Sequence, residues 1–322
     1  MPGATERSGT SHNPRTRCAA LPIVAARVPF LFLIFPICTY WMCWPIQFQP
    51  QPKMSSKRKR QINMPAPYLR RIWLEPSAIA DRAAYPFCLP FLRDEFELSF
   101  DRPITIIVGE NGTGKSTLLE GIAVLAGYDE AGGGKGYRTV DHSWALEKMG
   151  GQLSQALRAS WLPKITNGWF FRAESFFSVA RYLDQAALES PMGGGPPPDF
   201  LSHSHGEGFL RFFEERCRKQ GIYIFDEPES ALSPSRQMEF LKLMRRMEES
   251  TYCQVIMATH SPMLMAYPGA SLLRLSKYGL ESVSVEQTDH YKVMREFFAD
   301  PSGFVEAFMD EWTPRRRDVD QF

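Results

Sequence analysis

The stretch from Val108 to Thr117 reads VGENGTGKST and lies between an apolar run, 104–107, and the helical pattern LLEGIAVLAG. It contains the spacing G-x-x-x-x-G-K-[ST] from Gly109 to Ser116, in the strand-to-helix context that this motif requires. Glycines let successive backbone N–H groups face a single anion, and the N-terminus of the following helix adds a partial positive charge. The stretch therefore predicts a loop that holds the phosphates of ATP.

Each residue type in this loop has an expected task. Lys115 is expected to reach the β- and γ-phosphates, and the hydroxyl of Ser116 is expected to bind Mg²⁺. ATP and Mg²⁺ are thus the predicted cofactors. The candidate nucleotide-binding residues of the loop are Gly109, Asn111, Gly112, Thr113, Gly114, Lys115, Ser116 and Thr117.

A second motif, GIYIFDEPES at 221–230, places two carboxylates at the end of an apolar strand. Burying carboxylates there is costly unless they meet a cation. Asp226 is the candidate ligand for Mg²⁺ or its water shell, and Glu227 is the candidate base that takes a proton from the attacking water. An isolated Asp-Glu pair at a solvated strand end is the alternative, and the upstream phosphate loop weighs against it.

A third motif, VIMATHSP at 255–262, is another apolar strand that ends in polar residues. Ligands of open α/β sheets collect at the carboxyl ends of the strands, so His260 is predicted to sense the γ-phosphate. A structural histidine is the alternative interpretation.

Short apolar runs alternate with helical patterns from Tyr68 onward, which predicts a mostly parallel α/β sheet covered by helices on both faces. The clearest helix is Pro234–Glu249, which Ser233 would cap. The expected strands are 69–73, 95–100, 104–108, 169–172, 222–225, 255–258 and 272–275. The first two of these form an expected antiparallel region.

The three motifs, in this order, resemble those of the ABC-type and SMC-like ATPase superfamily, over residues 68–285. SHGEGFLRFF at 204–213 is similar to the signature element of that superfamily, with Ser204, Gly206 and Glu207 as candidate contacts to a nucleotide. ESALSPSRQ at 229–237 is similar to its D-loop. The signature departs from the LSGGQ of transporters, which favours relatives that are neither transporter subunits nor SMC arms.

The resemblance also points to a loop that carries a glutamine near the metal. FFRAESFF at 170–177 falls at this place and has no glutamine, so Glu174, as a metal ligand, or Arg172 would have to serve. The resemblance implies a P-loop NTPase fold of the ABC-ATPase type.

It further implies an ATP hydrolase that works as an ATP-dependent homodimer. The phosphate loop of one copy and the signature helix of the other would close on one nucleotide, and the cycle would drive an unknown protein partner. Two alternatives stay open, the ATPase subunit of an ABC transporter and a DNA-maintenance or phage-defence ATPase.

The chain divides by composition into three expected parts. Residues 64–290 form the ATPase domain, with a helical insertion at about 137–200 between two glycine-rich breaks, and 291–322 form a C-terminal helical tail. Residues 1–63 differ from the rest and contain an uncharged run at 28–46. This run is open to three interpretations: a membrane anchor, a disordered tail, or residues upstream of a true start at Met54 or Met64.

The overall composition adds two expectations. A formal net charge of +1 over 322 residues gives no general attraction to nucleic acid, which is therefore not indicated as a partner. The cysteines show neither CxxC pairs nor a disulfide framework, which favours a reducing compartment and a cytoplasmic location. They are Cys18, Cys38, Cys43, Cys88, Cys217 and Cys253.

Overall fold

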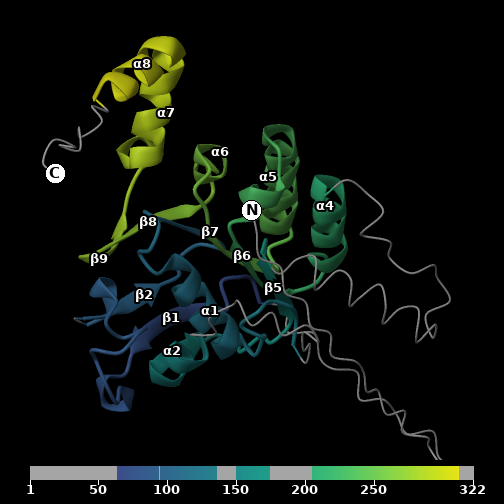
Figure 1. Cartoon of the computed structure of the whole chain (residues 1–322). Helices are drawn as coiled ribbons and strands as arrows, with labels where there is room; N and C mark the ends of the chain where they lie inside the picture. Colours follow the sequence, from purple (N-terminus) through teal and green to yellow (C-terminus); the bar gives the residue numbers. More distant parts are fainter. Residues whose placement is uncertain (1–63, 94, 136–149, 175–204, 312–322) are drawn as a thin grey trace, which may run out of the picture. The chain divides into compact units, whose positions relative to one another are not determined.

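Strand β3 (Ile104–Val108), which leads into the phosphate loop, lies inside the main sheet. The computed structural model describes residues 64–93, 95–135, 150–174 and 205–311 (Figure 1). Within these residues the sheet has six strands in the order β5-β6-β7-β3-β8-β9. All neighbouring pairs are parallel except β8 and β9, which form an antiparallel hairpin. The other strands are β5 (Gly168–Arg172), β6 (Gly221–Asp226), β7 (Cys253–Ala258), β8 (Ser271–Ser276) and β9 (Gly279–Ser282).

The central strands β3, β6 and β7 are buried along their whole length because both faces of the sheet are covered. Along β6, Ile222 and Ile224 pack in one hydrophobic cluster, whereas Tyr223 and Phe225 pack in another. Successive side chains of a strand point to opposite faces, so the two clusters lie on the two sides of the sheet. The mostly parallel sheet between helical layers confirms the predicted fold class.

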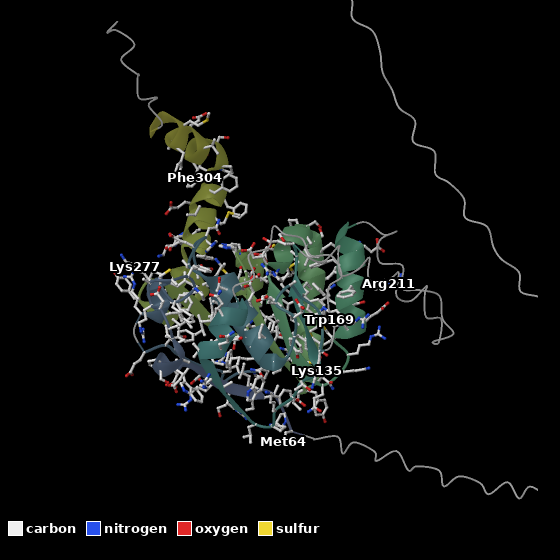
Figure 2. All side chains as sticks on the ribbon, turned by 60° about the horizontal axis from the view of Figure 1, so that its bottom comes forward. Met64, Lys135, Trp169, Arg211, Lys277 and Phe304 are labelled. Carbon is white, nitrogen blue, oxygen red and sulfur yellow. The ribbon has the colours of Figure 1, made fainter. Side chains whose placement is uncertain are left out.

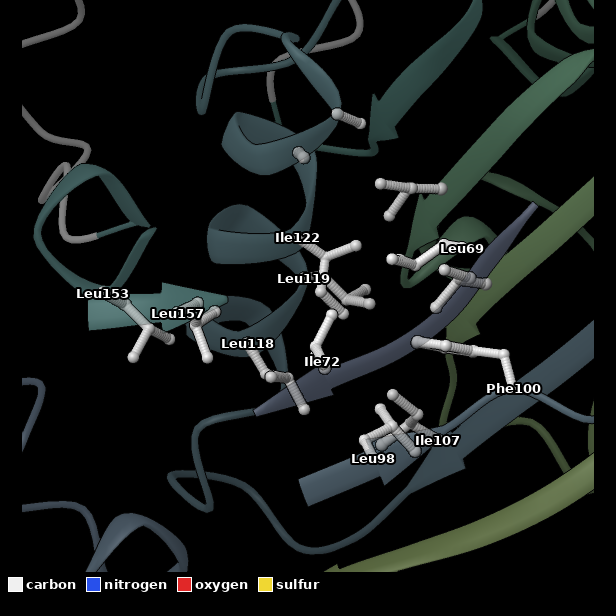
Figure 3. Close-up of a cluster of buried hydrophobic side chains, with 14 of the residues drawn as sticks. Leu69, Ile72, Leu98, Phe100, Ile107, Leu118, Leu119, Ile122, Leu153 and Leu157 are labelled. Atoms are coloured by element: carbon white, nitrogen blue, oxygen red, sulfur yellow. The ribbon is translucent and has the colours of Figure 1, made fainter. Parts of the chain in front are cut away.

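The first cluster is formed by side chains of helix α1, of the main sheet and of a small antiparallel sheet (Figure 3). This sheet has the order β2-β1-β4 among the described residues, with β1 at Leu69–Leu74, β2 at Glu97–Ser99 and β4 at Leu157–Trp161. The fully buried Gln254 of β7 ties the two sheets together. Its Oε1 accepts hydrogen bonds from the backbone N–H groups of Tyr68 (2.8 Å) and Leu69 (2.9 Å), and its Nε2 donates to the Leu69 carbonyl.

Helices cover both faces of the main sheet. Helix α1 (Lys115–Ala126) and α2 (Gly150–Ala156) contribute to the first cluster, and α4 (His205–Arg216), α5 (Pro234–Glu249) and α6 (Pro262–Met265) contribute to the second. Helix α5 has the predicted bounds, and its Ser233 cap accepts a hydrogen bond from the Arg236 N–H. Its apolar stripe, Phe240, Leu243, Met244 and Met247, is buried as the spacing requires.

Two strands escaped prediction because tertiary pairing creates them. β4 has the sequence LRASW, whose apolar alternation is only five residues long, and its extended form is held by pairing with β1. β9 pairs only as the return strand of the β8 hairpin. β2 is shorter than the expected 95–100 because only three residue pairs join it to β1.

The helical insertion expected at about 137–200 is described only in part, and this part is not helical throughout. Residues 150–174 contain α2, but also β4 and β5, and these strands belong to the two sheets. The rest of that range lies outside the described residues.

The last two described helices are α7 (Asp289–Ala299) and α8 (Pro301–Glu311). They correspond to the expected C-terminal helical tail. Within the described residues no helix is both long and apolar enough to cross a bilayer. The uncharged run at 28–46, and the expected extension 1–63 that contains it, lie outside that part of the chain.

Candidate functional site

The loop between β3 and α1 has a backbone that only glycine adopts easily. Gly112 and Gly114 have φ angles of 76° and 94°, in the left-handed region. A Cβ atom on Gly114 would also lie 2.8 Å from the ring of Phe91. The loop therefore turns sharply into α1 and presents the first N–H groups of the helix at its tip.

Lys115 begins α1 and is 5% exposed. Its ammonium group donates hydrogen bonds to the carbonyls of Gly109 and Glu110, both at 2.9 Å. Burial lowers the pKa of Lys115, and the carboxylates of Glu227 and Asp226 oppose this shift. A buried cation at the centre of an anion-binding loop is arranged to meet a phosphate.

Ser116 and Asp226 come together although 110 positions separate them in the chain. The hydroxyl of Ser116 donates to Oδ1 of Asp226 over 3.1 Å. Burial raises the pKa of Asp226 to about 6, against the opposing effect of Arg172. A hydroxyl and a carboxylate oxygen side by side are ligands that suit Mg²⁺, which completes its shell with waters and substrate phosphates.

Glu227 follows at the end of β6 with a φ angle of 48°, rare for a residue with a side chain. Such strain clusters at functional sites, because the surrounding structure holds it in place. Its side chain lines a pocket of about 460 Å³. The other residues of this pocket are Tyr85, Asn111, Gly112, Gly114, Lys115, Ser116 and Thr117.

His260 follows β7 and faces Glu227. Its Nε2 lies 3.5 Å from Oε1 of Glu227, and its Nδ1 lies 2.8 Å from Nε2 of His290. Its backbone N–H donates to the carboxylate of Glu229. The structure thus brings three candidate catalytic residues, Lys115, Glu227 and His260, around one end of the sheet.

Glu174 and Arg172, the two substitutes for the missing glutamine, differ in placement. The side chain of Glu174 is 70% exposed and pairs with Nη2 of Arg172 at 3.4 Å. Arg172 is buried, with Nε 3.6 Å from Oδ2 of Asp226. Its Nη1 lies 2.7 Å from Oε1 of Glu120. Arg172, rather than Glu174, therefore contacts the candidate metal ligand Asp226.

Replacing Arg172 by methionine is expected to destabilise the fold by about 3–5 kcal/mol, because it leaves Glu120 buried without its cation. Burial raises the pKa of Glu120 to about 7 from 4.5, even with Arg172 opposing, and loss of the guanidinium raises it further. When the pKa of an acid is higher in the folded protein than in the unfolded one, the protein loses stability as the pH rises through the folded pKa. The loss of stability caused by Arg172→Met is therefore larger at about pH 8 than at about pH 6. Denaturant unfolding at both pH values measures it.

The matched control for this prediction is the double variant Arg172→Met/Glu120→Gln, which removes the stranded charge. It should regain part of the lost stability and show a smaller increase of the deficit at the higher pH, with Asp226, the other carboxylate beside Arg172, as the source of what remains. An equal deficit at both pH values in the single variant would contradict the assignment.

The signature residues are only partly described. Ser204 lies outside the described residues, and Gly206 and Glu207 lie in the first turn of α4. Glu207 pairs with Arg236 of α5, with Oε2 3.8 Å from Nη2. Phe209 and Phe213 of the same helix are buried, as their spacing predicts.

Sequence reasoning missed several residues that touch the site. Tyr85 lines the pocket, and its hydroxyl bonds that of Thr117. Glu229 and His290 were also missed as contacts of His260, because nothing in their spacing signals such long-range contacts.

Comparisons with known proteins give two domain matches. A family model described as "AAA domain" matches residues 88–156, and one described as "AAA domain, putative AbiEii toxin, Type IV TA system" matches residues 193–266. The chain is also 35% identical over 68 residues to an OLD nuclease of Thermus scotoductus. That stretch covers 21% of this chain and spans 13% of the length of the relative.

Solved structures with similar backbones are more distant in sequence. cbiO1 from Clostridium perfringens, part of the ABC transporter complex cbiONQ, is 15% identical with a TM-score of 0.40, covering 76% of this chain and 100% of that chain. The SMC head domain from Thermotoga maritima is 14% identical with a TM-score of 0.37, covering 68% and 100%.

The two domain matches include the motifs that form the site. The first contains the phosphate loop with Lys115 and Ser116, and the second contains Asp226, Glu227 and His260. By these matches residues 88–156 and 193–266 are similar to AAA domains, and they carry the phosphate loop and the acidic strand end of a P-loop ATPase.

Proposed function

We propose that this protein binds ATP with Mg²⁺ and hydrolyses it to ADP and phosphate. The observation that carries this proposal is the contact of 3.1 Å between Oγ of Ser116 and Oδ1 of Asp226. Ser116 also lines the pocket, together with Lys115 and Glu227. Mg²⁺ held by Ser116 and Asp226 would neutralise charge on the β- and γ-phosphates.

The residues of the chain supply the remaining chemistry. Glu227 takes the proton of a water whose oxygen bonds to the γ-phosphorus, while the bond from that phosphorus to the β–γ bridging oxygen breaks and ADP leaves. Lys115 stabilises the charge that develops on the phosphate oxygens. His260 donates a hydrogen bond to the γ-phosphate and holds it in line with Glu227.

The cycle is proposed to run in a head-to-tail homodimer, in which Ser204, Gly206 and Glu207 of one copy meet the nucleotide of the other. The side chain of Glu207 is exposed in the first turn of α4, so a second copy can reach it. The likeness to the AbiEii-type AAA domain and to an OLD nuclease favours a DNA-maintenance or defence setting over membrane transport for the coupled process.

Phosphate release from ATP by the purified full chain tests the proposal. We expect turnover with Mg²⁺, loss of turnover when EDTA removes the metal, and a loss of about 100-fold or more in Asp226→Asn. Asp101→Asn, a change at an exposed carboxylate before β3, is the matched control and should leave turnover unchanged. Turnover that is equal with and without Mg²⁺ would contradict the assigned metal site.

A further inference from the structure

A second histidine, His290, contacts the side of the His260 ring that faces away from Glu227. Its Nε2 lies 2.8 Å from Nδ1 of His260, and the two rings lie 5.0 Å apart between centroids. His290 lies in the first turn of α7, outside every motif that the sequence singles out.

The base of α7 holds His290 in this place. Thr288, 1% exposed, caps the helix by accepting a hydrogen bond from the Tyr291 N–H, and its hydroxyl donates to the Val285 carbonyl over 2.6 Å. Val285 packs against the core cluster of the main sheet. The beginning of α7 is thus anchored, whereas its later turns and α8, which carries Phe304, expose apolar side chains to solvent (Figure 2).

Two neutral imidazoles at hydrogen-bond distance share one proton. Burial lowers the pKa of both His260 and His290, and the charge of Lys115 lowers them further, so both rings are neutral near pH 7. If Nδ1 of His260 carried the shared proton, its Nε2 would point a lone pair at the Glu227 carboxylate, 3.5 Å away. Two acceptors facing each other repel, so the tautomer that carries its proton on Nε2 of His260 is favoured.

We propose that His290 is a positioning residue for ATP hydrolysis, which donates its Nε2–H to Nδ1 of His260 and fixes the tautomer of that ring. His260 then carries its own proton on Nε2, on the side of Glu227. This nitrogen is buried and has no hydrogen-bond partner among the described residues, which leaves its N–H for a phosphate oxygen. The inference rests on the proposed hydrolysis, because it assigns the hydrogen-bond direction at that site.

The activity test compares two replacements of His290. His290→Phe keeps the ring size and removes the donor, and we expect kcat for ATP to fall about ten- to hundredfold with little change in KM. His290→Gln places an amide N–H near the Nε2 position and should recover most of the rate. In a His260→Ala background, His290→Phe should add little further loss, because the two residues act through one ring. Equal losses in both backgrounds would overturn the proposal.

A second readout does not depend on turnover. In ¹⁵N-histidine spectra of the nucleotide-free full chain, His260 should show the Nε2–H tautomer in the wild type and in Lys292→Gln, a control on the exposed face of α7. His290→Phe should give a mixture of tautomers. A wild-type His260 with its proton on Nδ1 overturns the inference, whereas a wild type that shows the expected tautomer but releases no phosphate overturns only the proposed function.

Discussion

Lys115→Ala is expected to lower the affinity for ATP by about 10²–10⁴-fold. The ammonium group lies at the centre of the phosphate loop, where burial removes competing water. Hydrogen bonds to charged groups contribute about 1.5–3 kcal/mol each, and two phosphates would each lose one. Isothermal titration calorimetry with Mg²⁺-ATP measures the change.

The control for this variant has to separate binding from folding, because Lys115 also bonds the Gly109 and Glu110 carbonyls. Lys277→Ala removes an exposed lysine from the β8–β9 turn and should bind ATP normally. Thermal unfolding of both variants shows whether the fold is intact. Undiminished affinity in folded Lys115→Ala would refute the assignment of the phosphate loop.

Glu227→Gln is expected to bind ATP but to turn it over about 10²–10⁴-fold more slowly, the range that a positioned general base supplies. An amide keeps the shape of the side chain and cannot accept the proton of the attacking water. If ATP joins two copies and hydrolysis separates them, the stalled variant should accumulate dimers. Single-turnover kinetics and size-exclusion chromatography with ATP measure the two effects.

Glu286→Gln is the matched control, because it makes the same chemical change at an exposed carboxylate near the base of α7. It should retain turnover and remain monomeric after ATP is consumed. A Glu227→Gln variant that binds ATP and stays monomeric would argue against the nucleotide-joined dimer. One that hydrolyses ATP at the normal rate would remove Glu227 from the role of base.

The sequence by itself determined the elements that follow local rules. Strand β3, the glycine turn and the start of α1 were predictable because a phosphate loop needs left-handed backbone at fixed spacings. The bounds of α5 were predictable because its cap, its first proline and its apolar stripe all agree. Asp226, Glu227 and His260 were identified because polar residues stand at the ends of apolar strands.

Only the tertiary structure decided which distant residues complete the site. The sequence left Glu174 and Arg172 as alternatives near the metal, and only the packing shows that Arg172 links Asp226 with Glu120. Tyr85 and His290 reach the phosphate loop and His260 from segments without any motif. The physical reason is that such contacts arise from packing between segments far apart in the chain, which no local spacing encodes.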